Sequence, residues 1–123
     1  MTRNLFRNTL FVFAAASFAG GAVAQPPQEI TVEAPRIEMT QVGRPSIARV
    51  LELTLTQRVG CEDLDLSTHT GMAELERRVR MAAQEACEEI GRKYPRARPS
   101  DLMCAGHATR EAMVEVRELL AAN

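Results

Sequence analysis

Residues 69–90 carry an unbroken apolar stripe at helical spacing, which predicts one long helix with a buried face. The apolar residues recur every three or four positions, so they share one side of an α-helix. Ser67 or Thr68 can cap the first turn with its hydroxyl, and Gly91 is typical of the residue that follows a helix end. The stripe consists of Met72, Leu75, Val79, Ala82, Ala86 and Ile90.

A second helix is predicted to follow a short basic loop at residues 92–99. Ser100 can cap this helix, and Asp101 favours its positive N-terminal end. Because the loop is short and contains two prolines, the two helices are expected to pack antiparallel. The buried face of the second helix should consist of Ala105, Ala108, Ala112, Val116 and Leu119.

A strand is predicted before the helices, over residues 49–59. Leu51, Leu53 and Leu55 alternate with polar residues, and this period of two is typical of a half-buried strand. The predicted fold class is therefore α+β, with one or two β-strands packed on a disulfide-linked antiparallel helical hairpin.

Residues 25–48 give a weaker signal. Residues 30–34 alternate as in a strand, but Pro35 is expected to end that strand, and residues 36–48 show no sustained period. We therefore expect residues 25–48 to be extended and poorly packed, and residues 49–123 to form the folded domain.

Residues 1–24 have the three parts of a secretory signal peptide. Arg3 and Arg7 supply the positive charge, residues 10–18 form a short apolar run, and residues 22–24 (Ala-Val-Ala) form a small-x-small cleavage site. The apolar run is shorter than the roughly 20 residues of a membrane-spanning helix. The sequence predicts export, cleavage before Gln25, and no transmembrane anchor afterwards.

The three cysteines allow three possible disulfides, and spacing alone does not choose among them. Cys87 lies near the end of the first predicted helix and Cys104 in the first turns of the second, so an antiparallel hairpin places them opposite each other. An oxidising compartment favours such a bridge. Cys61 is then a free or intermolecular thiol, or a small buried residue that contributes only to packing.

The residues that could carry chemistry are few. Glu62, Asp63 and Asp65 form an acidic cluster that could bind a metal cation such as calcium, although Asp63 and Asp65 can equally be solvated or favour the first helix. His69 and His107 are isolated, and no zinc, nucleotide or nucleophile motif accompanies them. No catalytic residue and no cofactor is predicted.

Charge also bears on the class of protein. The formal net charge is −1, which does not suit the broad basic surface of a nucleic-acid-binding protein. The basic residues around Tyr94 in the 92–99 loop can either contact an anion or lipid headgroup, or form a solvated turn that offsets nearby glutamates.

A set of segments stands out along the predicted strand end and helices: Val59 to Thr68 (Val-Gly-Cys-Glu-Asp-Leu-Asp-Leu-Ser-Thr), Gly71, Leu75-Glu-Arg-Arg78, Ala82-Ala83, Cys87 and Cys104. Together they resemble the UrcA family, small exported proteins of Gram-negative bacteria with a signal peptide and two helical cysteines. The resemblance covers roughly residues 49–120 and implies a periplasmic or secreted location. It also supports a Cys87–Cys104 bridge, but it implies no catalytic or binding residues, because the family's molecular function is not established. Two positions depart from the family pattern: Cys61, where an aromatic is usual, and His69, where proline is frequent.

The sequence therefore predicts a small exported periplasmic protein that is not an enzyme and acts by binding or interaction in the cell envelope. Its partner would be another protein or a second copy of the chain. The alternative is a metal-binding or cation-binding protein that uses Glu62, Asp63 and Asp65.

Overall fold

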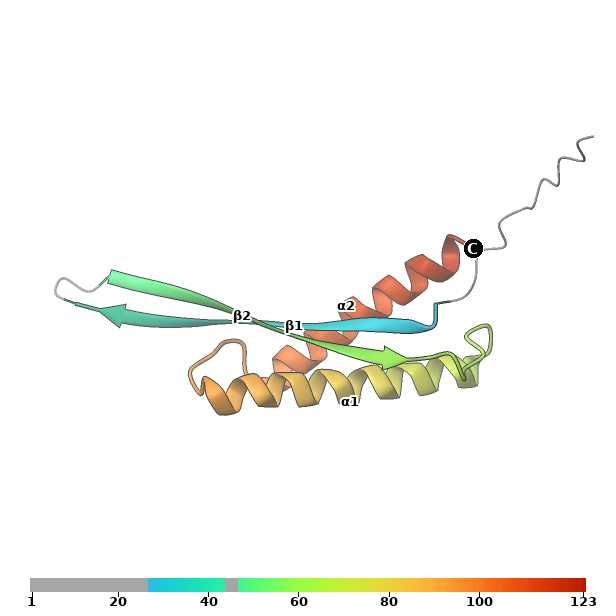
Figure 1. The fold of residues 1–123 in the computed structure, drawn as a ribbon, viewed down its shortest axis with the longest axis horizontal. Helices are drawn as coiled ribbons and strands as arrows, with labels where there is room; N and C mark the ends of the chain where they lie inside the picture. The colour runs from blue at the N-terminus through green and yellow to red at the C-terminus, as the bar shows by residue number, and fades with distance from the viewer. Residues whose placement is uncertain (1–26, 44–46) are drawn as a thin grey trace, which may run out of the picture.

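The computed structural model describes residues 27–43 and 47–123 (Figure 1). The elements are, in order, β1 (Glu29–Val42), β2 (Ile47–Gly60), α1 (His69–Lys93) and α2 (Asp101–Ala121). The two strands form an antiparallel sheet, and the two helices are joined by a Cys87–Cys104 disulfide. This confirms the predicted α+β class; the predicted signal peptide lies outside the described residues.

The two strands form one long hairpin that extends past both helices (Figure 1). Pairing runs without interruption from Glu29 opposite Gly60 to Val42 opposite Ile47. The expectation that residues 25–48 are poorly packed is therefore corrected for residues 30–36, where Ile30, Val32 and Ala34 are fully buried. The reason is non-local, because β1 is held by β2 and by the helices rather than by its own pattern.

Pro35 does not end β1, contrary to the expectation from the sequence. The N–H and C=O of Ile37 both bond to Arg98, at 2.8 and 2.7 Å, so they point away from β2. Pro35 lies two residues earlier on the same edge of the strand. Its missing N–H therefore costs no hydrogen bond to β2.

Helix α1 begins where its cap predicts and ends later than expected. The Thr68 hydroxyl accepts a hydrogen bond from the Gly71 N–H at 3.0 Å, as predicted for an N-cap residue. The predicted end at Gly91 is wrong, because the helix continues to Lys93. Gly91 lies inside the helix beside the start of α2, where an added Cβ would push the Asp101 carboxylate aside.

The two helices meet at their disulfide end and cover the inner face of the sheet. The buried face of α1 includes Leu75, Val79 and Ile90, and that of α2 is the predicted alanine stripe with Met113 and Val116. Leu119 is 40% exposed, so it lies off the buried face predicted for it. Ser100 occupies the N-cap position of α2 without a side-chain cap bond.

Replacing Gly71 by alanine is expected to destabilise the protein by about 1–3 kcal/mol. A Cβ at position 71 would overlap the backbone carbonyl of Asp65, so the turn before α1 must shift. The matched control is Gly106→Ala in α2, where the nearest atom to the added Cβ is Arg110 Nη1 at 3.5 Å. There the higher helix propensity of alanine should stabilise by up to about 1 kcal/mol. Urea unfolding of the two variants measures both effects, and equal effects in both would contradict the close approach at Gly71.

Candidate functional site

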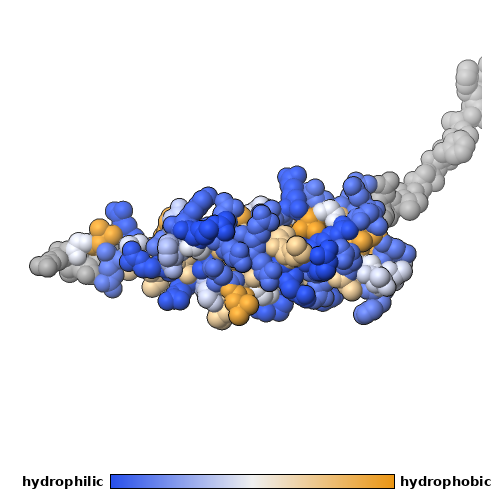
Figure 2. Space-filling model, turned by 90° about the horizontal axis from the view of Figure 1, so that it is seen from below, coloured by the Kyte–Doolittle hydropathy of each residue, from blue (hydrophilic) through white to orange (hydrophobic). Residues whose placement is uncertain are grey.

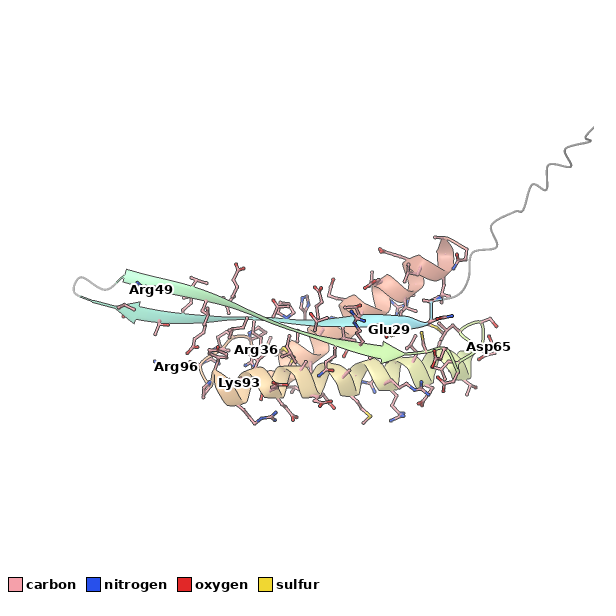
Figure 3. All side chains as sticks on the ribbon, in the orientation of Figure 1. Glu29, Arg36, Arg49, Asp65, Lys93 and Arg96 are labelled. Atoms are coloured by element: carbon pink, nitrogen blue, oxygen red, sulfur yellow. A yellow bond between two sulfur atoms is a disulfide. The ribbon has the colours of Figure 1, made fainter. Side chains whose placement is uncertain are left out.

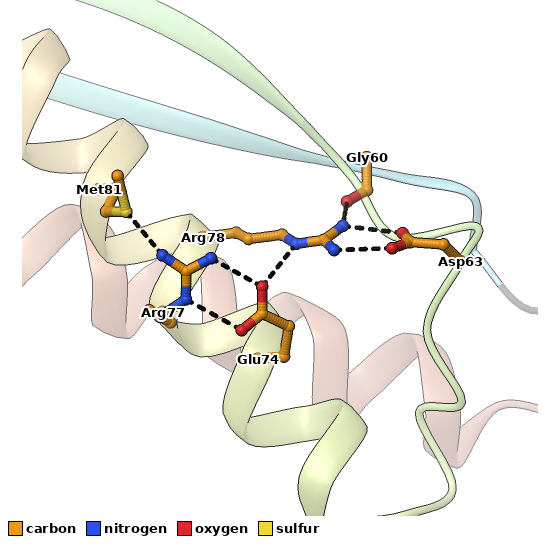
Figure 4. Close-up of polar contacts among 6 residues, drawn as sticks. All are labelled: Gly60, Asp63, Glu74, Arg77, Arg78 and Met81. Carbon is orange, nitrogen blue, oxygen red and sulfur yellow. Dashed lines mark hydrogen bonds and ion pairs between the residues drawn. The ribbon is translucent and has the colours of Figure 1, made fainter.

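The acidic cluster predicted from the sequence is engaged by protein groups (Figure 4). Asp63 accepts two hydrogen bonds from the Arg78 guanidinium, at 2.8 and 2.7 Å. Asp65 accepts from the N–H and the hydroxyl of Ser67, at 3.0 and 2.6 Å. Asp63 therefore ties the turn between β2 and α1 to the helix, whereas Asp65 stabilises the turn itself.

The cation alternative receives no support from this geometry. Across residues 27–43 and 47–123, no three His, Cys, Asp or Glu side chains are arranged as a group that could hold a metal ion. The physical reason is that Arg78 already provides the positive charge beside Asp63, and Ser67 orients Asp65 as a turn residue. Glu62 is exposed.

Arg78 links three parts of the chain. Besides Asp63, its guanidinium donates to the Gly60 carbonyl at the end of β2 and to Glu74 one helical turn earlier, each at 3.0 Å. Arg77 also donates to Glu74, at 2.9 and 2.8 Å. These bonds to Arg77 and Arg78 lower the pKa of the Glu74 carboxyl from 4.5 to about 2, and hydrogen bonds from Arg78 lower that of Asp63.

Replacing Glu74 by glutamine is expected to reduce the loss of folding stability at acid pH. Because its pKa is lower in the folded state, Glu74 contributes stability that is complete above its unfolded value of 4.5 and is lost as the pH falls toward about 2. The wild-type protein should therefore lose stability over this window, and Glu74→Gln should lose less of it. Urea midpoints at several pH values measure this; Glu76→Gln, which removes a single exposed ion pair with Arg80 at 2.6 Å, is the control. An unchanged acid slope in Glu74→Gln would contradict the assignment.

Cys61 is a free thiol and is buried, with 1% of its surface exposed. Its Sγ donates to the Pro27 carbonyl at 3.1 Å, and its N–H donates to the Gln28 carbonyl at 2.9 Å. Burial raises the pKa of the Cys61 thiol, against a smaller opposite effect of the Arg78 charge. The geometry therefore favours the packing role among the alternatives that the sequence left open.

Arg36 is a central polar residue that the sequence did not indicate. Its side chain is 3% exposed and reaches from β1 to the disulfide end of the helices (Figure 3). It donates to the Cys87 carbonyl at 2.8 Å, the Ala97 carbonyl at 2.9 Å and the Asp101 carboxylate at 2.6 Å. The sequence did contain one sign that Arg36 is buried, because position 36 continues the inward alternation of Ile30, Val32 and Ala34.

The basic loop and the histidines are mostly solvated. Lys93 bonds Glu89 at 3.0 Å, and Arg96 lies 3.9 Å from Glu38. His107 Nδ1 lies 4.0 Å from Glu111, and His69 is exposed at the first position of α1. For the 92–99 loop, these contacts favour the interpretation of a solvated turn that offsets nearby glutamates.

We define the hairpin arm as residues 37–42 and 47–52. It is the part of the hairpin next to the connection between β1 and β2. Five of its large apolar residues are exposed: Met39 by 62%, Val50 by 58%, Leu51 by 47%, Val42 by 45% and Ile37 by 42%. In Figure 2 apolar side chains are visible beside the grey loop at this end of the molecule, on an otherwise largely hydrophilic face. The arm therefore presents apolar groups that the fold itself does not cover.

A shallow groove runs beside the end of β2 that lies away from the arm. It has a volume of about 550 Å³ and lies between Arg58 on β2 and the Arg77, Arg78 and Met81 side of α1, with Glu85 and Glu88 farther along the helix. Met81 is 55% exposed there. Helix α1 thus leaves open space next to the outer edge of β2.

Comparison of the chain with protein-family models, with curated proteins and with solved structures finds no match. Neither α1 nor α2, the helices in the described part of the chain, is long and apolar enough to cross a membrane.

Proposed function

We propose that this chain is a small exported protein of the UrcA type that acts in the periplasm by binding another protein chain through its hairpin arm, without catalysing a reaction. The observation that carries the proposal is the exposure of Ile37, Met39, Val42, Val50 and Leu51 on that arm. Ile37, Met39 and Val50 share the outer face of the arm, with Met39 directly opposite Val50, and neighbouring exposed apolar side chains of this kind are typical of an interaction site.

The two strands of the arm are also fixed in place at their base. The base is anchored where Ile37 pairs with Arg98 and where Arg36 is bonded to three groups beneath the strand. A partner that binds the arm therefore meets a preformed two-stranded ribbon, and little conformational entropy is lost when the complex forms.

Site-specific photo-cross-linking in intact cells tests the binding function. A photoreactive residue at Met39 or Val50 should give a cross-linked adduct on irradiation, because both side chains are more than half exposed on the arm. The matched control is the same residue at Arg117, which is exposed on α2. The mass of the adduct identifies the partner; adducts that are equally abundant at Arg117, or absent from the arm, contradict the proposal.

Export is tested by the intact mass of the protein recovered from the envelope fraction, with and without reductant. The expected mass begins at Gln25, is two hydrogens light because of one disulfide, and gains one alkyl group on Cys61 after unfolding. A protein that retains residues 1–24 and has three free thiols contradicts the proposed location.

A further inference from the structure

We infer that this chain pairs with a second copy of itself through a second surface, by antiparallel pairing of the outer edges of the two β2 strands about Leu55. The inference goes beyond the proposed function, because the paired residues, Leu51–Val59, lie mostly outside the hairpin arm and leave Ile37, Met39 and Val42 on the other strand. It would turn two hairpins into one four-stranded sheet with a two-fold axis, the commonest symmetry of homodimers.

The outer edge of β2 carries unpaired backbone groups. Because the N–H and C=O of Ile37 point away from β2, those of Glu52, directly opposite Ile37, point away from β1. This direction recurs at every second residue, so between residues 52 and 60 the outward groups belong to Glu52, Thr54, Thr56, Arg58 and Gly60.

Only the last of these positions is used within the fold. Arg78 donates to the Gly60 carbonyl at 3.0 Å. Within residues 27–43 and 47–123, no hydrogen bond reaches the outward backbone groups of Glu52, Thr54, Thr56 or Arg58. An unpaired strand edge of this length is a template for pairing with another strand.

The side chains on the solvent face of this edge are complementary to themselves. Read along β2, they are Glu52, Thr54, Thr56 and Arg58, an acidic residue, two threonines and a basic residue. When two such strands pair antiparallel about Leu55, Glu52 of each copy faces Arg58 of the other, and Thr54 faces Thr56. Opposite charges and threonine pairs in these positions stabilise a sheet, whereas like charges destabilise it.

The same charges select one register. A shift of two residues in either direction places Glu52 opposite Thr56 or Gly60 and leaves Arg58 without a carboxylate. A shift of one residue would place the leucines of the second copy on the opposite face of the sheet. Arg58 is 76% exposed in the monomer, where its Nε lies 3.5 Å from Glu29, and this exposed ion pair must give way for Arg58 to reach a carboxylate across the new edge.

Apolar side chains on the inner face of β2 also become more buried in this register. Leu55 faces Leu55 of the second copy, and Leu51, which is 47% exposed, faces Val59. Leu53 and Leu55 are only partly buried in the single chain, where they pack at the margin of the core. The open groove between Arg58 and Met81 provides room for the added strand beside α1.

A charge-reversal series on the purified full-length mature protein, measured by sedimentation equilibrium, tests the inference. The wild type should be a dimer in reversible equilibrium with monomer. Arg58→Glu and Glu52→Arg each create two like-charge pairs, so each should raise the dimer dissociation constant by about tenfold or more. The double variant with both changes restores two opposite-charge pairs and should return the constant to near the wild-type value.

Mixing the two single variants gives a sharper result. Glu52 and the new glutamate of one variant then face the two arginines of the other, so an equimolar mixture should form heterodimers while each variant alone is mainly monomeric. The matched control is Glu33→Arg, the same charge change on the same face of β1 but away from the edge. It should leave the dissociation constant unchanged.

Disulfide trapping checks the register independently of charge. Opposed residues in a non-hydrogen-bonded antiparallel pair have Cα atoms about 4.5 Å apart, which a disulfide can span. Oxidised Leu55→Cys, in a Cys61→Ala background, should therefore form a covalent dimer. Leu53→Cys, whose side chain faces Gln57 of the second copy, should not.

The inference is overturned if the wild type is monomeric at submillimolar concentration, if Arg58→Glu and Glu33→Arg weaken the dimer equally, or if the double variant is not restored. Its failure can be told apart from failure of the proposed function. An arm adduct in cells that contains a different protein, together with a monomeric purified chain, overturns the self-pairing and leaves the binding function standing. A monomeric chain without arm adducts overturns both.

Discussion

Replacing Arg36 by alanine is expected to lower the free energy of unfolding by about 3 kcal/mol. The change leaves the carbonyls of Cys87 and Ala97 without their donor in a buried environment, and it separates β1 from the start of α2. The Asp101 side chain is 49% exposed, so water can replace the guanidinium there and this bond contributes less. Arg36→Lys should recover only part of the loss, because one ammonium lacks the planar fork that reaches three acceptors.

Urea unfolding at a fixed protein concentration measures this effect. The control is Arg49→Ala, which removes an exposed arginine from β2 and should change the free energy of unfolding by no more than about 0.5 kcal/mol. If Arg36→Ala and Arg49→Ala are equally mild, Arg36 does not hold the sheet to the helices.

Removing the disulfide with Cys87→Ala and Cys104→Ala is expected to cost about 3 kcal/mol. The bridge closes a loop with a sequence separation of 17, and a loop of this size restricts the unfolded chain by about that amount. Both cysteines are almost fully buried between the helices, so their replacement also removes packing.

Reductant separates this effect from simple loss of side-chain volume. Adding reductant should lower the urea midpoint of the wild type and leave that of the double variant unchanged. Cys61→Ala keeps the bridge and loses the thiol contact with Pro27, so it should remain sensitive to reductant. A double variant as stable as the wild type would show that the bridge contributes little to the fold.

These two changes should not be additive. Arg36 bonds the backbone carbonyl of Cys87, one of the two bridged residues, at 2.8 Å. Removing the bridge loosens the position of that carbonyl, so a part of the contribution of Arg36 is lost with it. A double-mutant cycle over Arg36→Ala and the two cysteine changes measures this coupling.

The sequence by itself determined the elements whose signals are local. The stripe from Leu75 to Ile90 repeats within one helix, and Thr68 caps a backbone amide three residues away, so both could be recognised without any tertiary contact. The facing positions of Cys87 and Cys104 followed from the short loop between two helices. The inward leucines of β2 were likewise visible as an alternation along one strand.

Only the tertiary structure decided what depends on distant partners. The strand β1 continues through Pro35 because β2 and Arg98 lie on its two sides, and Arg36 is buried because acceptors at Cys87, Ala97 and Asp101 converge on it from far along the chain. The helix continues past Gly91 to Lys93, and the space beside Gly91 is occupied by the Asp101 carboxylate from the start of α2. Asp63, in turn, is engaged by Arg78, fifteen residues away. Each of these outcomes comes from a contact between residues far apart in sequence, which local patterns of hydrophobicity, capping and spacing do not encode.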